Sequence, residues 1–406
     1  MRFDGIGGGN RLTVRGGPVA LRRLLLQAPM MGRDPEQMDD SPAAVGQTLS
    51  ADNDRHPADG AGRRSVDLWS DGRARFIVTV DTEEEFDWAA PFSRDRHGTT
   101  HVAAIAPFQS ICDAAGVVPI YLVDWPIVVD PVAASLIGGW CAAGKADVGA
   151  QLHPWVNPPF DEQVNSANSY TANLPVALQR AKLEELVAAI ARQLGVRPRI
   201  YRAGRYGVGP HTPAMLADCG IALDTSVRSG FDYRRGHGPD FSQSPLTPYW
   251  LIDGKVAELP VTTLFGGVLR QWARTIFPLL TPRLSAAAAR LGLVERIALT
   301  PEGIPVDRAL AAIDLAIEAR LPLLTFSFHS PSLAVGHTPY VRTQADLDRF
   351  YLWWDKVFAR LSERGIAPAS LTDLLAATGV AVTEPACQPP PPSANAPAGG
   401  ACSSVG

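Results

Sequence analysis

The fold of this chain is decided by the stretch Arg75-Phe76-Ile77-Val78-Thr79-Val80-Asp81-Thr82-Glu83-Glu84-Glu85-Phe86-Asp87-Trp88. Its first part is mostly apolar and β-branched and predicts a buried strand over 75–81. In parallel α/β folds, ligands bind beyond the carboxyl ends of the strands, where Asp81 and Glu83 stand. A buried carboxylate is costly unless a metal, a base or a proton shares its charge. The stretch therefore predicts a catalytic or metal-binding cluster, with a solvated acidic helix start as the alternative.

Strands and helices alternate after this stretch. Further strands are expected at Val117–Val123, Asp147–Leu152, Arg199–Ala203, Ala222–Ser226 and Leu323–His329. The spacing of apolar residues and the end signals predict helices at His101–Ala115, Leu174–Leu194, Thr212–Cys219, Val306–Ala319 and Gln344–Arg364. A β-hairpin with a type I′ turn at Asp253-Gly254 is expected to join 249–252 to 256–259. The alternation predicts an α/β fold with a parallel sheet, either a barrel or an open sheet.

The two ends of the chain differ in composition from its middle. Residues 1–70 lack a sustained hydrophobic period and are expected to be disordered or an extension, and the Pro- and Ala-rich residues 381–406 are expected to form a disordered tail. One domain is therefore expected over 71–380. Within it, residues 266–304 fit neither a strand nor a helix period well, and a helical insertion is expected there.

Charge and composition argue against several partners. The net charge of −4 gives no electrostatic reason to expect nucleic acid or an anionic membrane. No apolar run approaches the roughly 18 residues that a membrane span needs. The five cysteines form no CxxC pair, and the apolar run at 19–26 is broken by two arginines, which makes it a poor secretion signal. We therefore expect a cytoplasmic protein without disulfides, and the sequence leaves its oligomeric state open.

More polar residues stand at or near the ends of the other expected strands. They are His153, Arg202, Asp224 and His329. Each is a weak signal alone, because a lone histidine or arginine is more often structural. Together with the acidic stretch they set acids, bases and a cation at successive strand ends, as a metal-assisted or acid–base barrel enzyme requires. The remaining acids of the stretch, Glu84, Glu85 and Asp87, are expected to be solvated or to lie behind the site.

In this order, the segments 79–88, 150–160 and 202–207 resemble the polysaccharide deacetylase superfamily, known for its NodB homology and as carbohydrate esterase family 4. The chain is most similar to the divergent WalW-like branch, which is linked to bacterial surface-polysaccharide loci, and the resemblance covers about residues 75–379. It implies a distorted (β/α)7 barrel. It also implies a hydrolase that removes an N-acetyl group from a carbohydrate with a divalent metal, Zn²⁺ or a similar ion.

The resemblance also implies catalytic roles. Asp81 resembles the general base, and His329 resembles the general acid that protonates the leaving amine. Arg202 resembles the arginine that orients the base, and Asp224 the acid that polarises the catalytic histidine. The chain departs from the family at Thr82, where a second aspartate is usual.

The implied metal site departs further. Glu83 resembles the metal carboxylate and His153 a metal histidine. The family has a second histidine four residues later, but Asn157 stands there. A zinc site takes three protein ligands, so Gln151, Asn157 or His101 is expected to complete the set. Such a mixed set would bind zinc less tightly, favour a harder ion, or bind none.

Two other functions remain open. A catalytically inactive member of the fold would bind a saccharide, with Trp88, Trp125 and Trp155 as stacking surfaces or as ordinary core residues. A metal-dependent glycosyltransferase is the weaker alternative, since 81–83 mimics an Asp-x-Asp motif after a strand. It lacks a glycine-rich nucleotide cradle, and it leaves the histidine at 329 unexplained.

Overall fold

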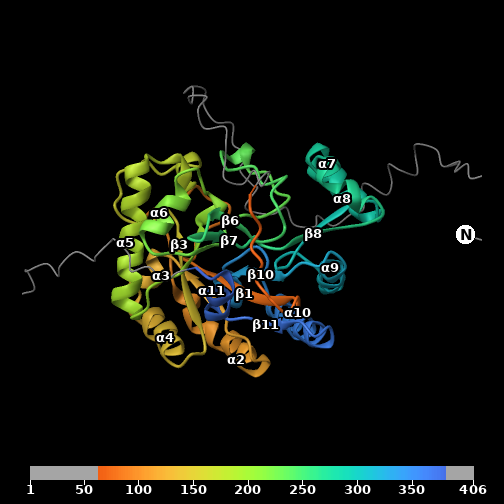
Figure 1. Cartoon of the computed structure of the whole chain (residues 1–406). Coiled ribbons are helices and arrows are strands. Elements are labelled where there is room, and N and C mark those ends of the chain that lie inside the picture. The colour runs from red at the N-terminus through yellow and green to blue at the C-terminus, as the bar shows by residue number, and fades with distance from the viewer. Residues whose placement is uncertain (1–62, 381–406) are drawn as a thin grey trace, which may run out of the picture.

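The computed structural model describes residues 63–380 and shows a sheet whose main strands are parallel and curl into a distorted (β/α) barrel, which confirms the expected fold (Figure 1). The strand order is β10-β1-β2-β3-β4-β5-β7, with β6 antiparallel to β7 at the edge and β11 paired with β1. The strands span Arg75–Thr82 (β1), Ile120–Val123 (β2), Asp147–Leu152 (β3), Ile200–Ala203 (β4), Leu223–Asp224 (β5), Tyr249–Ile252 (β6), Val256–Glu258 (β7), Leu323–His329 (β10) and Ala367–Pro368 (β11).

Helices follow most of the strands and surround the barrel (Figure 1). All five expected helices are confirmed with small shifts at their ends, whereas α3, α4 and α11 were not expected. No helix within 63–380 is both long enough and apolar enough to cross a membrane. The helices span Ile105–Ala115 (α2), Trp125–Val129 (α3), Pro131–Ala142 (α4), Val176–Leu194 (α5), Thr212–Asp218 (α6), Ala273–Ile276 (α7), Pro282–Arg290 (α8), Val306–Glu318 (α9), Gln344–Glu363 (α10) and Leu371–Thr378 (α11).

Irregular segments close the barrel between β7 and β10. The amide of Thr262 donates to the carbonyl of Thr325 (3.3 Å), and the amide of Ser327 donates to the carbonyl of Leu299 (3.2 Å). The residues between these two segments form an arm. It consists of the antiparallel strands β8 (Thr263–Gly266) and β9 (Glu295–Ala298), joined through α7 and α8. The segment expected to be a helical insertion therefore contains two short helices and a strand.

Alternation along the strands sorts the side chains into two layers. On β1, Ile77 belongs to the core inside the barrel, whereas Phe76 and Val78 belong to the core beneath the helices. Because neighbouring side chains on a strand face opposite sides, Thr79 and Asp81 share the interior face with Ile77. The interior face of β1 thus changes from apolar to polar toward the carboxyl end of the strand.

The β6–β7 hairpin is present, but its turn is not of type I′. Type I′ needs positive φ at both central residues. Of Asp253 and Gly254, only Gly254 has a positive φ, of 68°. The amide of Lys255 donates to the carbonyl of Ile252 (3.0 Å) and closes the turn. Glycine at the second central position is the requirement of a type II turn instead.

Residues 63–70, expected to lie outside the domain, pack against the barrel. Val66 and Leu68 are only 5% and 4% exposed and belong to the core inside the barrel, together with Leu371 and Leu374. The amide of Val66 donates to the carbonyl of Pro248 (3.0 Å). The barrel domain therefore begins before residue 71. The expected tails at 1–62 and 381–406 lie outside the described residues.

Candidate active site

A cavity of about 760 Å³ lies at the carboxyl ends of the strands. This volume falls in the range of pockets that hold small ligands. Six of the nine residues expected in the site contribute to its lining, and Asp224, Asn157 and His101 do not. The lining includes Asp81, Glu83, Gln151, His153, Arg202 and His329, and the aromatic residues Phe86, Trp88, Phe92, Trp155 and Tyr206.

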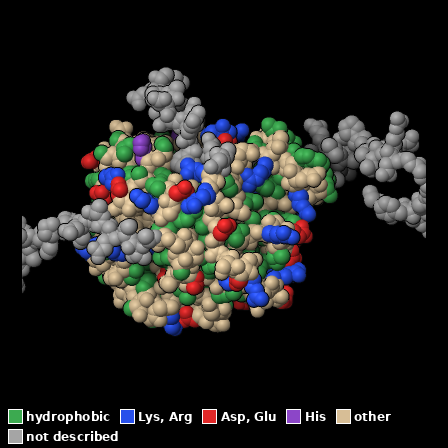
Figure 2. Space-filling model, viewed as in Figure 1, with side chains coloured by type: hydrophobic (Ala, Val, Ile, Leu, Met, Phe, Trp, Pro, Cys, Tyr) green, Lys and Arg blue, Asp and Glu red, His purple; other side chains and the backbone are tan. Residues whose placement is uncertain are grey.

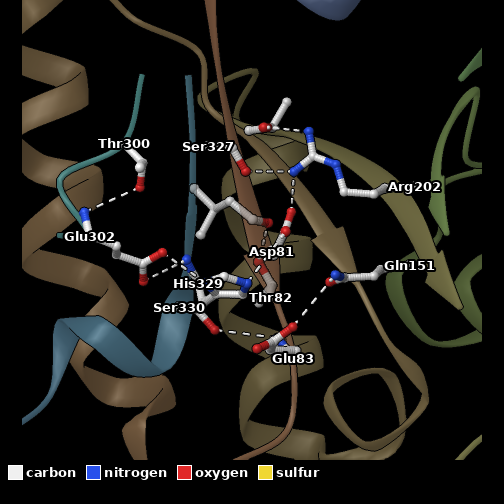
Figure 3. Close-up of polar contacts among 12 residues, drawn as sticks. Asp81, Thr82, Glu83, Gln151, Arg202, Thr300, Glu302, Ser327, His329 and Ser330 are labelled. Carbon is white, nitrogen blue, oxygen red and sulfur yellow. Dashed lines mark hydrogen bonds and ion pairs between the residues drawn. The ribbon is translucent and has the colours of Figure 1, made fainter. Parts of the chain in front are cut away.

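Arg202 holds Asp81 from inside the barrel. Its Nη1 donates to Asp81 Oδ1 and to Ser327 Oγ, the latter at 2.7 Å (Figure 3). Its Nη2 donates to Thr79 Oγ1 (2.9 Å), and its Nε donates to the carbonyl of Thr225 (3.0 Å). Arg202 is 1% exposed, so these partners compensate a fully buried charge. The network fixes one carboxylate oxygen of Asp81 and leaves Oδ2 for the cavity.

Glu302 holds His329 on the opposite side. Glu302 Oε2 accepts a hydrogen bond from His329 Nδ1 (2.7 Å), and its Oε1 accepts from the amide of His329 (3.2 Å) (Figure 3). Glu302 Oε1 also accepts from the hydroxyl of Ser332. Because a carboxylate only accepts, ionised Glu302 keeps the proton on Nδ1. His329 Nε2 then faces the cavity, 4.0 Å from Asp81 Oδ2.

Asp224 does not hold His329, contrary to what the resemblance implied. It pairs in register with Tyr201 and Glu258, while Thr225 is the residue of this segment that contacts Arg202. Since neighbours on a strand face opposite sides, Asp224 lies on the outer side of the barrel, away from the cavity. Burial raises the pKa of Asp224 to about 7 and the pKa of Glu258 well above its usual value. The two side chains form a buried carboxyl pair.

Glu83, Gln151 and His153 lie together beside the Asp81–His329 pair. Glu83 Oε2 is 3.5 Å from Gln151 Nε2 (Figure 3). It is also 3.5 Å from His153 Nε2. Glu83 Oε1 and Gln151 Oε1 are buried and have no hydrogen-bond partner among the described residues. Burial raises the pKa of Glu83 well above its usual value, and the charge of His329 opposes this shift. Two unsatisfied oxygens beside an imidazole nitrogen are a donor set for a cation.

Two further carboxyl groups hold His153 from behind. Glu84 Oε2 accepts from His153 Nδ1 (2.8 Å), and Glu84 Oε1 accepts from Trp155 Nε1 (2.8 Å). The two oxygens of Asp124 accept from the amides of Glu84 (2.8 Å) and Ile127 (3.1 Å). Burial raises the pKa of Glu84 and raises that of Asp124 well above its usual value. Glu84, Asp124 and His153 thus form a buried group with ligand atoms within 4.8 Å of one another.

Two residues expected as further metal ligands lie elsewhere. Asn157 Nδ2 donates to the carbonyl of Lys182 (2.9 Å) and ties its loop to α5. His101 Nδ1 is 3.0 Å from Glu85 Oε1, and its Nε2 is 2.7 Å from Ser330 Oγ. Neither Asn157 nor His101 lines the cavity. Their positions give no support to a ligand role.

Aromatic rings form one wall of the cavity. The rings of Phe86 and Trp88 stack at 4.8 Å, and Trp88 meets His329 edge-on at 5.2 Å. The ring of Trp155 stacks on His153 at 4.5 Å. Trp125, the third tryptophan expected as a stacking surface, instead packs against the core beneath the helices. Flat rings beside polar groups suit a ligand that has both apolar and polar faces.

Glu302 and Glu84 complete the site, and the sequence did not single out either role. Glu302 lies in a loop 27 residues before His329, inside a segment that fits no periodic pattern, so no local signal marks it. Glu84 stands in a run of three glutamates, and such a run usually indicates a solvated surface. The sequence signal that could have pointed to Glu84 is Trp155, because a buried indole N–H needs a hydrogen-bond acceptor.

Comparison with known proteins relates the chain to others by structure alone. No family model and no curated protein matches it. Its structure aligns with the catalytic domain of a peptidoglycan N-acetylglucosamine deacetylase from Eubacterium rectale (10% identity, 77% of this chain and 94% of that chain, TM-score 0.34). It also aligns with a family 4 acetyl xylan esterase from Clostridium thermocellum, solved with a cobalt ion (15% identity, 76% and 93%, TM-score 0.36). A third similar structure is the Puue allantoinase (13% identity, 80% and 97%, TM-score 0.45). These identities and TM-scores are too low to assign a function, so the function has to be argued from the geometry of the site.

Proposed function

We propose that the protein hydrolyses the N-acetyl amide of a carbohydrate in this cavity. We further propose that the reaction belongs to surface-polysaccharide metabolism. The arrangement of Asp81 and His329 carries this proposal. Asp81 Oδ2 and His329 Nε2 face each other at 4.0 Å, and each side chain is held from behind, Asp81 by Arg202 and His329 by Glu302. Such a pair suits the removal of a proton from water and the delivery of a proton to a leaving amine. The aromatic wall and the resemblance described above favour a sugar as the substrate.

Glu83, Gln151 and the Nε2 atom of His153 would hold a divalent cation beside this pair. The two unsatisfied oxygens of Glu83 and Gln151 support this assignment. The buried group around Glu84 and Asp124 is a poorer site, because its oxygens already accept hydrogen bonds. A divalent ion held there would polarise the acetyl carbonyl and would lower the pKa of a bound water to roughly 7. The resemblance implies Zn²⁺, while the oxygen-rich donor set also suits a harder ion such as Mn²⁺.

The residues of the chain divide the proton transfers between them. Asp81 takes a proton from the attacking water, whose oxygen forms a bond to the acetyl carbon. His329 Nε2 then donates a proton to the nitrogen as the carbon–nitrogen bond breaks, which gives acetate and a free amine. Arg202 holds the carboxylate of Asp81 in position through Oδ1, and Glu302 stabilises the imidazolium form of His329.

The substitution Asp81→Asn tests the proposal. We expect acetate release from N-acetylated glycans to fall by about 10²-fold or more, since the variant lacks a base. The metal content, measured by mass spectrometry of the purified protein, should stay unchanged because Asp81 is not a proposed ligand. Asp87→Asn is the matched control, since Asp87 is an exposed carboxylate in the same cavity lining. Full activity in Asp81→Asn would remove Asp81 from the role of base.

The same purified protein distinguishes the alternatives. Binding of N-acetylated glycans in calorimetry, without acetate release and without stoichiometric metal, would contradict the hydrolase and indicate a saccharide-binding protein. A melting temperature raised by nucleotide sugars, and not by glycans, would indicate a glycosyltransferase. The hydrolase is favoured over both alternatives because it assigns a catalytic role to the buried pair of Glu302 and His329.

A further inference from the structure

The arm between β8 and β9 exposes large apolar side chains. Figure 1 shows its helices α7 and α8 projecting from the barrel. Within this arm, Val268, Trp272, Leu279, Leu284 and Leu291 are 75%, 53%, 78%, 55% and 72% exposed. They include the three most exposed of the large apolar residues in the described chain. Exposed apolar side chains gathered in this way mark an interaction site.

The arm carries charge of one sign. Residues 267–294 contain no aspartate or glutamate and four arginines, which are Arg270, Arg274, Arg283 and Arg290. Arg270 lies 3.2 Å from Glu318, and Arg274 donates to a backbone carbonyl of the barrel domain (2.7 Å), so these two anchor the arm. Arg283 and Arg290 are exposed on α8. The net charge of −4 for the whole chain conceals this local positive charge.

The apolar and basic side chains have a regular placement along α8 and at its C-terminal cap residue, Leu291. Leu284 and Leu291 are seven positions apart, and so are Arg283 and Arg290. Seven residues make nearly two helical turns, so the members of each pair share a face and the two pairs lie side by side. Figure 2 shows hydrophobic and basic side chains together over this end of the molecule.

We propose that the arm docks the protein on the surface of an anionic lipid bilayer. The tryptophan and leucines would enter the boundary between headgroups and acyl chains, and the arginines would pair with lipid phosphates. Charge selects this occupant over a second copy of the chain, because a symmetric contact through this face would place arginine against arginine. The proposal is independent of the chemistry in the cavity.

Sedimentation of the full chain with vesicles tests this proposal. We expect binding to vesicles of phosphatidylglycerol and phosphatidylcholine, weaker binding at high salt, and little binding to phosphatidylcholine alone. The double substitution Arg283→Gln/Arg290→Gln should lower the partition coefficient roughly 30-fold, since each arginine near such a surface contributes about fivefold. Leu279→Ser/Leu284→Ser should also weaken binding by removing inserted apolar area.

Matched controls distinguish binding through the arm from a general effect of removing positive charge or exposed apolar area anywhere on the protein. Arg192→Gln/Arg197→Gln on and after α5, and Val132→Ser on α4, change exposed residues outside the arm and should leave vesicle binding unchanged. Absence of binding to anionic vesicles, or an equal loss in these controls, overturns the proposal. A dimer seen by analytical ultracentrifugation and lost in Leu279→Ser/Leu284→Ser would assign the arm to a second copy of the chain instead.

Discussion

Three of the residues that face the cavity each have their own supporting partner. Arg202 supports Asp81, Glu302 supports His329, and Glu84 supports His153. Each partner is buried, so the orientation of the residue that faces the cavity is fixed before a ligand arrives. Fixed polar groups of this kind lose little energy to reorganisation during a reaction.

The substitution Glu302→Gln tests the support of His329. We expect kcat to fall by about 10²-fold, because the neutral amide stabilises the imidazolium less well. The alkaline limb of the pH–rate profile should move to lower pH, since the general acid then loses its proton more readily. Glu295→Gln, a half-buried glutamate on β9, is the control. A lower kcat with an unmoved limb would assign Glu302 a purely structural role.

The sequence predicted the six polar residues at the centre of the cavity, because the strand ends at or near which they stand are easy to locate. It failed at Asp224, because β5 has only two residues and the pattern does not determine which of its side chains face inward. A shift of one residue moves a side chain to the opposite face of a sheet. Glu302 was missed because its contact with His329 joins a loop to strand β10, and the sequence does not give the relative position of these two segments.

Among the elements, helix α5 stabilises the loop that follows β3. Lys182 is fully buried, and its Nζ donates to the carbonyls of Pro154 (2.9 Å), Asn157 (2.6 Å) and Pro159 (2.7 Å). It also lies 3.0 Å from Glu162 Oε2. One ammonium group therefore fixes the loop between His153 at the site and the start of α5.

Replacement of Lys182 by methionine tests this support. The variant leaves three carbonyls without their donor and leaves the buried carboxylate of Glu162 with Arg94 as its one remaining cation, so we expect the free energy of unfolding to fall by about 3–5 kcal/mol. Lys145→Met is the control, since Lys145 pairs with Asp113 at the surface and should contribute no more than about 1 kcal/mol. Urea denaturation measures both, and equal effects would contradict a special role for Lys182.

Elements with a clear period were predicted well, and those without one were not. The strands β3 and β10 have the predicted bounds because each is a compact run before a polar residue. Helices α3 and α4 were missed, because residues 125–142 form an almost continuous apolar run with two prolines and two glycines. Such a run hides the helical period, and only packing against the barrel decides its structure.

For the molecule as a whole, the buried carboxyl pair of Asp224 and Glu258 links stability to pH. The pKa of Asp224 is raised from 3.8 to about 7 in the folded protein, chiefly by burial. Between these values the unfolded chain loses this proton and the folded chain keeps it. The contribution of Asp224 to stability is therefore present at low pH and is lost as the pH rises toward 7.

The substitution Asp224→Asn should remove this dependence. We expect the stability of the variant relative to the natural chain to rise between about pH 4 and pH 7 and to stay constant above that. Urea denaturation across this range measures the difference. Asp253→Asn changes an exposed residue and should give a difference without slope. A flat difference for Asp224→Asn as well would mean that the pair does not hold its proton in this range.

The base of the arm lies close to the active site. Arg296 on β9 stacks over Phe277 of the arm at 4.7 Å and also lines a hollow that adjoins His329. A protein held by this arm would keep its cavity near the surface on which it rests. It would then meet surface-bound substrates by two-dimensional diffusion, and its turnover would follow their density on that surface, not their concentration in bulk solution.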